Sequence, residues 1–198
     1  MGRVAGIILA AGKSSRMGRM KLLLDVHGKP MLGQVVESAL ASALDQVIVV
    51  LGGEYERILD SVDFKVATVV FNPDFWKGQS TSLRAGIEAA GENCDAALFL
   101  LGDMPLVDSG VIDGVLQKYK ATGASIVIPI FAGRRGNPVL LARSLFPMVL
   151  ALEGDIGARA ILAAHEDLVE TVDVAHDGIL ADVDTWEDYL RTFKPPDG

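Results

Sequence analysis

Cationic side chains cluster directly after the first apolar run of the chain. The run covers residues 4–9, the small residues Ala10-Ala11-Gly12 end it, and the cations that follow are Lys13, Arg16, Arg19 and Lys21. Small residues let backbone N–H groups approach an anion closely, and the cations supply the charge that a polyphosphate needs. The stretch matches neither of the two common glycine-rich phosphate-binding patterns, Gly-x-x-x-x-Gly-Lys-Ser/Thr and Gly-x-Gly-x-x-Gly. The residues alone therefore allow a phosphate-binding loop or a basic surface loop.

Carboxylates occur at two places where they could hold a cation. Asp103 follows an apolar run, and Asp182 and Asp184 alternate in the segment before Thr185. If that segment is extended, both of its carboxylates point to the same face, so either could reach an ion. Mg²⁺ is typically held by one or two carboxylates together with phosphate oxygens. Asp103 beside a triphosphate loop is thus a candidate metal ligand, and helix capping is the alternative at both places.

A hydroxyl-rich segment precedes a predicted helix in the middle of the chain. It reads Gly78-Gln79-Ser80-Thr81-Ser82. Capping a helix N-terminus needs only one Ser or Thr, so the additional donors and acceptors suit recognition of a base or a ribose. Capping alone is the alternative, because such loops are frequent. Trp76 comes just before this segment, and we expect it to pack in the interior rather than to serve as a stacking platform.

Size and composition limit the class of protein. The chain has 198 residues, half of them hydrophobic, which predicts one domain over residues 1–193 with a flexible tail at 194–198. A net charge of −8, without a basic stripe beyond the first loop, argues against a nucleic-acid partner. No apolar run reaches the ~18 residues that would span a membrane, so we expect no membrane partner. Cys94 is the single cysteine, which excludes an intrachain disulfide and a cysteine zinc site and favours a reducing cytoplasm.

Apolar, β-branched runs alternate with helix-like segments over the first two thirds of the chain. The predicted strands are residues 4–9, 47–51, 66–71, 96–101 and 125–130, and the predicted helices are residues 31–44, 80–91 and 109–122. Such alternation implies right-handed β-α-β crossovers. The sequence therefore predicts an α/β fold, a three-layer α/β/α sandwich around a mostly parallel twisted sheet.

The last third of the sequence is less regular. We expect a hairpin turn at residues 133–136, a strand at 138–141 and a helix over 142–164 that is interrupted at 153–157. A strand at 168–172 and a final helix from Thr185 complete the prediction, with Asp188 closing a capping box on Thr185. The three histidines, at positions 27, 165 and 176, have no metal-ligand spacing, so we expect them at the surface or its boundary.

The informative segments all follow predicted strands. Ligands of open α/β sheets bind beyond the carboxyl ends of the strands. The loops at residues 10–21, 52–53, 72–82 and 102–103 each occupy such a position. We therefore expect the cations, the hydroxyl-rich segment and Asp103 to converge on one edge of the sheet.

The pattern Leu-Ala-Ala-Gly-x-x-x-Arg-Met-Gly-x-x-Lys from Leu9 to Lys21 resembles the signature of nucleotidyltransferases with a Rossmann-like GT-A fold. The nearest subgroup is the molybdopterin nucleotidyltransferases, and the resemblance runs over about residues 6–189. It implies a loop that wraps the triphosphate of an incoming nucleotide, with Arg16 and Lys21 as catalytic residues on its phosphates. It further implies a Mg²⁺ ion held by Asp103, also catalytic, and by Asp184, with the share of Asp182 left open.

The resemblance also implies a nucleotide site. The segment from Gly78 is similar to the cytidylyltransferase branch, whose relatives have a serine near the cytosine at the position of Ser82. Gly86 would let its helix pack close to the first loop. The implied nucleotide-binding residues are Leu9, Ala10, Ala11, Gly12, Lys13, Ser14, Gly78, Ser80, Ser82, Gly86 and Gly102.

The choice of base depends mainly on Ala11. The guanylyl branch has glycine there, and the additional methyl group is consistent with a pyrimidine, although one methyl discriminates by only ~1–3 kcal/mol.

Two further segments are candidates for the acceptor site. The residue types at 136–138 and 154–159 are those of ordinary turns, but both stretches resemble acceptor-side segments of the cytidylyltransferase branch. Asn137, Asp155 and Arg159 are therefore acceptor-binding candidates.

The resulting hypothesis is a Mg²⁺-dependent transfer of CMP from CTP to the phosphate of a molybdopterin-type cofactor, with release of pyrophosphate. Its small-molecule partners would be CTP and the molybdopterin phosphate, with a transient contact to a molybdoenzyme or its maturation protein. Two alternatives stay open. One keeps the reaction but uses GTP, or a sugar or polyol phosphate as acceptor. The other is a carrier of the mature molybdenum cofactor that has no catalytic activity.

Overall fold

One mixed sheet forms the centre of the molecule. The structure, a computed structural model, describes residues 2–12 and 20–193. The strands are β1 (Val4–Ala10), β4 (Gln46–Leu51), β5 (Thr68–Phe71), β6 (Ala96–Leu101), β7 (Ile126–Phe131), β8 (Arg134–Arg135), β9 (Val139–Ala142) and β10 (Val169–Asp173). Their order is β10-β7-β9-β6-β1-β4-β5, with β8 on β7. Only β8 and β9 run antiparallel to their neighbours within this sheet, which confirms the predicted mostly parallel sheet.

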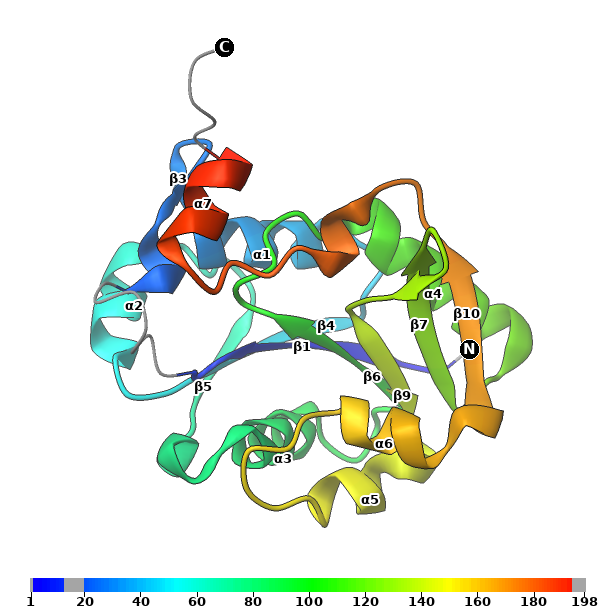
Figure 1. Ribbon diagram of the computed structural model, residues 1–198. Helices are drawn as coiled ribbons and strands as arrows, with labels where there is room; N and C mark the ends of the chain where they lie inside the picture. The colour runs from blue at the N-terminus through cyan, green and yellow to red at the C-terminus, as the bar shows by residue number, and fades with distance from the viewer. Residues whose placement is uncertain (1, 13–19, 194–198) are drawn as a thin grey trace.

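Helices cover both faces of this sheet (Figure 1). The helices on one face are α1 (Met31–Leu40), α2 (Tyr55–Ser61) and α4 (Ser109–Thr122), and those on the other are α3 (Gln79–Ala90), α5 (Phe146–Leu150) and α6 (Arg159–Ala164). Side chains alternate along β1, so Ile8 packs into the core under α1 and α4 and Ile7 into the core under α3. Both are fully buried. The predicted three layers are confirmed.

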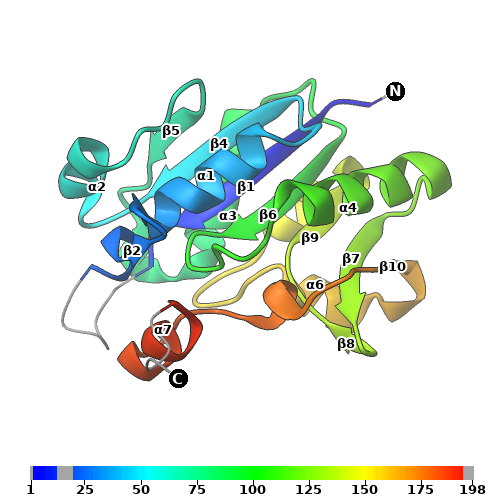
Figure 2. The same cartoon turned by 90° about the horizontal axis from the view of Figure 1, so that it is seen from above.

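The C-terminal helix α7 (Trp186–Phe193) returns to the beginning of the chain. It packs against the small hairpin of β2 (Asp25–Val26) and β3 (Lys29–Pro30), beside which it lies in Figure 2. The hydroxyl of Tyr189 donates a 2.7 Å hydrogen bond to the Asp25 carbonyl, and Tyr189 is buried with Val26 and Val183. The segment before α7 is thereby held across the edge of the sheet where β1 and β6 end.

Several predicted elements have different bounds in the structure. Helix α1 ends at Leu40 rather than at residue 44, β5 begins at Thr68 rather than at residue 66, and α2 was missed. The backbone N–H of Ala43 is bound by the carboxylate of Asp113 on α4, so a tertiary contact holds the turn that ends α1. The segment 142–164 forms two short helices, α5 and α6, and the hairpin turn is centred on Ala132-Gly133, both with positive φ, so that Arg134 and Arg135 are strand residues.

The capping box at the start of α7 is confirmed. The backbone N–H of Asp188 donates to the Thr185 hydroxyl (3.1 Å), and the Asp188 carboxylate accepts from the backbone N–H of Thr185 (2.9 Å). The predicted tail, residues 194–198, lies outside the described residues. Within the part of the chain that the structure covers, no helix combines the length and apolar character needed to cross a membrane.

Candidate active site

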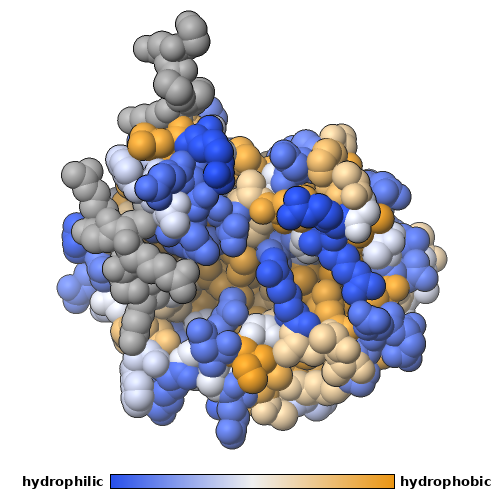
Figure 3. All heavy atoms as spheres, viewed as in Figure 1, coloured by the Kyte–Doolittle hydropathy of each residue, from blue (hydrophilic) through white to orange (hydrophobic). Residues whose placement is uncertain are grey.

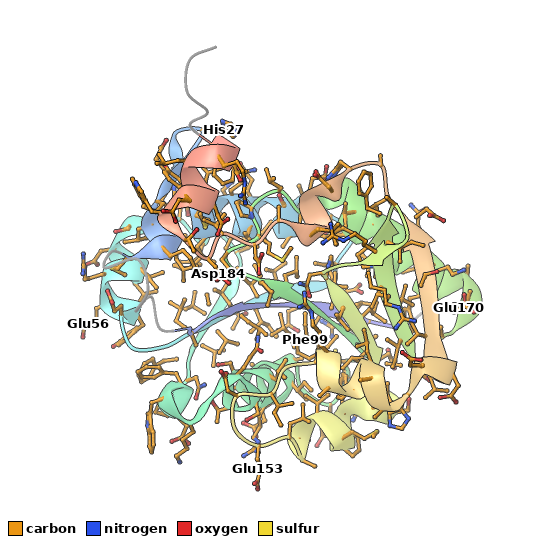
Figure 4. All side chains as sticks on the ribbon, viewed as in Figure 1. His27, Glu56, Phe99, Glu153, Glu170 and Asp184 are labelled. Atoms are coloured by element: carbon orange, nitrogen blue, oxygen red, sulfur yellow. The ribbon has the colours of Figure 1, made fainter. Side chains whose placement is uncertain are left out.

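Three charged residues from distant parts of the chain meet beyond the ends of β1 and β6. The ammonium of Lys21 donates to a carboxylate oxygen of Asp103 at 2.7 Å and to one of Asp184 at 3.0 Å. Asp103 follows β6, and Asp184 lies in the segment that crosses above the sheet toward α7 (Figure 4). The backbone N–H of Val183 donates to the Asp103 carbonyl at 3.2 Å, which ties the two segments together. We call these three residues the charged triad.

The charged triad is partly shielded from solvent. The side chains of Lys21 and Asp103 are 16% and 21% exposed, and that of Asp184 is 48% exposed. Burial lowers the pKa of the Lys21 ammonium, but the negative charge of Asp103 and hydrogen bonds to Asp103 and Asp184 outweigh it and leave this pKa above its ordinary value. Lys21 therefore carries its positive charge at neutral pH.

A cavity of about 690 Å³ opens beside the charged triad. It corresponds to the hollow in the face shown in Figure 3, whose rim is largely hydrophilic and whose floor contains hydrophobic residues. The site residues predicted from the sequence that line this cavity are Leu9, Ala10, Ala11, Gly12, Lys21, Gly78, Ser82, Asp103, Asp155 and Asp184. A second, smaller cavity adjoins it across Ala10–Gly12 and is lined also by Gly52 and Gly53. The predicted convergence is confirmed for the residues of the four strand-end loops that line these two cavities, whereas Asp155 and Asp184 come from segments for which no convergence was predicted.

The hydroxyl-rich segment is organised by a buried residue that sequence reasoning did not single out. Asn72 is 3% exposed, and its side-chain amide donates to the hydroxyls of Thr81 (2.9 Å) and Ser82 (3.1 Å). Ser82 lines the large cavity, whereas Ser80 is buried and donates its backbone N–H to the Gly154 carbonyl. An asparagine directly after an apolar strand was the available signal, since it can bond both neighbouring backbone and side-chain groups.

Asp155 has a structural role in this arrangement. The helix α3 begins after Gly78, which has no side chain to cap it, and the Asp155 carboxylate accepts the backbone N–H of Gln79 at 3.2 Å instead. A side chain at Gly78 would collide with the backbone of Gly154, so the two loops are in close contact. Asp155, one of the acceptor-binding candidates, lines the cavity, and its observed partner is the N-terminus of α3.

Other predicted residues lie elsewhere. Asn137 is buried and donates its side-chain amide to the sulfur of Met104 at 3.3 Å, and Arg159 is exposed at the start of α6. Gly86 packs against Ile7 of β1, where a Cβ would collide. Gly102 fits between Ala10 and Leu32. The predicted positions Lys13, Ser14 and Arg16 lie outside the described residues.

The packing role expected for Trp76 is wrong. Its side chain is 61% exposed and lines the large cavity, together with Lys77, Gln79 and Asp182, which were not among the predicted nucleotide or acceptor residues. Its neighbour Phe75 is half-buried, lies in close contact with Gly52 and Gly53, and also lines the cavity. Adjacent residues of a short turn point in different directions, and the sequence does not tell which of two aromatic residues faces inward.

The carboxylates at this site suit a divalent ion that also binds a phosphate of the substrate. Among residues 2–12 and 20–193, no group of three or more His, Cys, Asp or Glu side chains is arranged to hold a metal on its own. Asp103 and Asp184 lie close enough to share one ammonium, and Asp182 lines the same cavity. Mg²⁺ is commonly held by one or two carboxylates with substrate phosphates, so these two carboxylates fit such an ion.

Comparison with known proteins decides the family. Residues 6–169 match the MobA-like NTP transferase domain. The chain belongs to the MobA-like NTP transferase family. It therefore has the fold of a nucleotidyltransferase, and the family resemblance found in the loop from Leu9 to Lys21 is confirmed.

Curated relatives in this family carry different functions. The chain is 32% identical to the purine catabolism protein PucB of Bacillus subtilis, with 93% of each chain covered. It is 30% identical to nicotine blue oxidoreductase of Paenarthrobacter nicotinovorans, with 95% of each chain covered. It is 27% identical to the molybdenum cofactor cytidylyltransferase of Escherichia coli, over 96% of this chain and 95% of the relative.

Solved structures agree with the fold. Rv0371c of Mycobacterium tuberculosis superimposes with a TM-score of 0.89 at 27% identity over 98% of both chains. A manganese complex of Rv0371c superimposes with a TM-score of 0.84 at 26% identity, over 97% of this chain and 98% of the neighbour. Manganese is thus present in a structure that resembles this chain over nearly its full length.

Proposed function

We propose that the protein is a Mg²⁺-dependent cytidylyltransferase that transfers CMP from CTP to the phosphate of a molybdopterin-type acceptor. The observation that carries the proposal is the charged triad, which lies beside a cavity in a chain of the MobA-like family. The similarity to the molybdenum cofactor cytidylyltransferase of Escherichia coli over nearly the whole length supports this choice of substrates.

The reaction is an in-line displacement at the α-phosphorus of CTP. An oxygen of the acceptor phosphate forms a bond to this phosphorus, the bond to the oxygen that bridges to the β-phosphate breaks, and pyrophosphate leaves with the electron pair. A protein contributes to such a transfer mainly by positioning and by neutralising charge. Asp103 and Asp184 would hold the Mg²⁺ ion, which would supply positive charge to the phosphate oxygens.

The cations of the first loop would receive the leaving group. In the structure Lys21 binds both carboxylates, and its ammonium can turn to a phosphate oxygen when the carboxylates bind a metal ion. We assign the same task to Arg16 by the family motif. The backbone N–H groups around Ala11 and Gly12, at the open end of β1, would bind the remaining phosphate oxygens.

Base selection would depend on the floor and one wall of the cavity. Ala11 lines the cavity, and we infer that its methyl group leaves less room for the base than a glycine would. The Ser82 hydroxyl, whose position is set by Asn72, would face the cytosine. One methyl group contributes only ~1–3 kcal/mol to discrimination, so we expect a preference for CTP rather than complete exclusion of GTP.

The proposal is tested by measuring pyrophosphate release with Mg²⁺ and molybdopterin, with CTP and GTP in parallel. We expect release with CTP and formation of a cytosine dinucleotide form of the cofactor. Selectivity for GTP would keep the reaction and overturn the base assignment. Release that occurs only with a sugar or polyol phosphate would change the acceptor. Binding of the cofactor without any release would favour the carrier alternative.

A further inference from the structure

Trp76 faces the large cavity from a turn whose position is fixed by contacts with neighbouring segments. The turn is the 3-10 segment Phe75–Lys77, and Phe75 anchors it against Gly52 and Gly53, at the end of the neighbouring strand. Trp76 itself is 61% exposed, although tryptophan is usually largely buried. An exposed aromatic ring that lines a cavity, on a turn held by its aromatic neighbour, is arranged for contact with a ligand.

The same turn is held by polar contacts on its other side. Asn72 accepts the backbone N–H of Asp74 at 3.0 Å, and the Thr81 hydroxyl donates to the Asp74 carbonyl at 3.1 Å. Asn72 is buried, and both of these bonds are partly buried. The backbone of the turn is therefore ordered before a ligand binds, and a contact with Trp76 requires little additional ordering.

Lys77 gives the ring a charged neighbour. Its ammonium lies over the Trp76 indole, 5.3 Å from the ring centroid, and forms a 2.9 Å ion pair with Asp74. The cation occupies one face of the ring, and most of the remaining surface is open to the cavity and solvent. A planar ring could stack on the indole while a phosphate attached to that ring binds Lys77.

We propose that Trp76 is a stacking platform for the planar heteroaromatic ring of a phosphorylated ligand, and that Lys77 binds a phosphate of the same ligand. The inference rests on the proposed function in that the cavity then binds two ring-bearing ligands. The ring is either the cytosine of CTP or the pterin of the acceptor. Both rings are flat, polar and electron-poor, which suits stacking on an indole.

Fluorescence tests the platform directly. Trp186→Phe removes the only other tryptophan, so the signal then reports Trp76 alone. We expect CTP or a pterin phosphate to quench this signal saturably and to protect Trp76 from acrylamide. Inorganic tripolyphosphate, which has charge but no ring, should do neither. Quenching by CTP only identifies the cytosine, and quenching by the pterin phosphate only identifies the acceptor. No ring-dependent change with either ligand overturns the proposal.

Substitutions measure the contribution of the ring. Trp76→Ala should weaken binding of the stacked ligand roughly 5- to 150-fold, by analogy with base stacking on aromatic side chains. It should leave binding of the other ligand within about twofold, and Trp76→Phe should restore most of the affinity. Melting temperatures control for folding. Equal affinities in the Trp76→Ala variant and the parent protein would overturn the platform.

Failure of the platform and failure of the proposed function are distinguishable. If the parent protein transfers CMP and Trp76→Ala retains full affinity for both ligands, the function stands and the platform is wrong. If no transfer occurs but ring-bearing ligands still quench Trp76 and tripolyphosphate does not, the platform stands and the reaction is wrong.

Discussion

Lys21 lies between two carboxylates that we propose as metal ligands. Its ammonium is 2.7 Å from a carboxylate oxygen of Asp103 and 3.0 Å from one of Asp184. A metal ion that binds these oxygens must take over at least part of the charge neutralisation that Lys21 provides. Lys21 and the metal therefore compete in the free protein, and phosphates that attract Lys21 would relieve the competition. Metal and nucleotide should bind cooperatively for this reason.

The competition predicts an effect on metal affinity in the absence of nucleotide. Lys21→Met should raise the affinity of the free protein for Mn²⁺ about fivefold, because a partly buried ion pair contributes on the order of 1 kcal/mol. Electron paramagnetic resonance of free Mn²⁺ measures this change. Lys77→Met is the matched control, since Lys77 pairs with Asp74 instead of the triad. Unchanged or weaker Mn²⁺ binding by Lys21→Met would show that Lys21 does not compete.

Asp103 is the residue on which the metal assignment depends most. Asp103→Asn should lower turnover at least ~100-fold, because it removes charge stabilisation at the reacting phosphates. Asp60→Asn, at an exposed position on α2, should leave turnover unchanged. Circular dichroism and the melting temperature establish whether the variant is folded. A folded Asp103→Asn protein with normal turnover would refute this assignment, and the same measurement on Asp182→Asn decides whether Asp182 shares the site.

At the scale of elements, α3 brings Ser82 to the cavity because the helix lies very close to β1. Gly86 makes this approach possible, since a Cβ there would collide with the side chain of Ile7. Gly86→Ala should therefore destabilise the protein by about 1–3 kcal/mol and weaken nucleotide binding through displacement of α3. Denaturant unfolding and nucleotide titration measure the two effects.

Gly114 of α4 is the matched control for this substitution. A Cβ at this position would meet a methyl group of Val172 at 3.9 Å, which is an ordinary contact distance. Gly114→Ala should therefore stabilise the protein by up to about 1 kcal/mol, because alanine has the higher helix propensity. A similar loss of stability in both variants would show that close packing of α3 is not the cause.

The capping box of α7 connects stability to pH. The hydrogen bond from the Thr185 hydroxyl lowers the pKa of the Asp188 carboxyl, so this group stabilises the folded state when it is ionised. The contribution is complete above its ordinary pKa of 3.8 and is lost as the pH falls through the lowered value. Thr185→Ala should cost about 1 kcal/mol at pH 7, and the difference from the parent protein should shrink below pH 4. Urea unfolding of the variant and the parent protein at pH 7 and below pH 4 measures this difference in stability. A difference that does not depend on pH would contradict this account.

At the scale of the whole molecule, the cavity is built from segments that are far apart in the sequence. The first loop, the turn before α3, the end of β6 and the segment before α7 all contribute to it. A ligand that contacts all of them stabilises the folded state, because the unfolded chain has no such site.

This stabilisation can be measured as a shift of the melting temperature. CTP with Mg²⁺, at about 100 times its dissociation constant, should stabilise the protein by ~2.7 kcal/mol and raise the melting temperature by roughly 5–10 °C. Removal of the metal with EDTA should reduce the shift. In the Asp103→Asn variant the shift with CTP should be the same with and without Mg²⁺. A large, Mg²⁺-dependent shift in this variant would place the metal elsewhere.

Much of the fold and part of the site followed from local sequence patterns. Alternating apolar runs and helix-like segments predicted the layers, because each strand must be buried on both faces and each helix on one. The family motif from Leu9 to Lys21 and the carboxylates Asp103 and Asp184 were recognisable from their types and spacing. Of these, the loop with Lys21 and the carboxylate of Asp103 follow strands, and this position predicted that they meet, because parallel strands end at a common edge.

Only the tertiary structure decided which groups meet and which side chains face the cavity. Lys21 and Asp184 are 163 residues apart, and their contact depends on the packing of α7 against the β2–β3 hairpin. The exposure of Trp76, the burial of Asn72 and the capping of α3 by Asp155 depend on neighbours from other segments. Local patterns reflect backbone preference and the burial of one face, whereas such contacts are set by how the elements pack together.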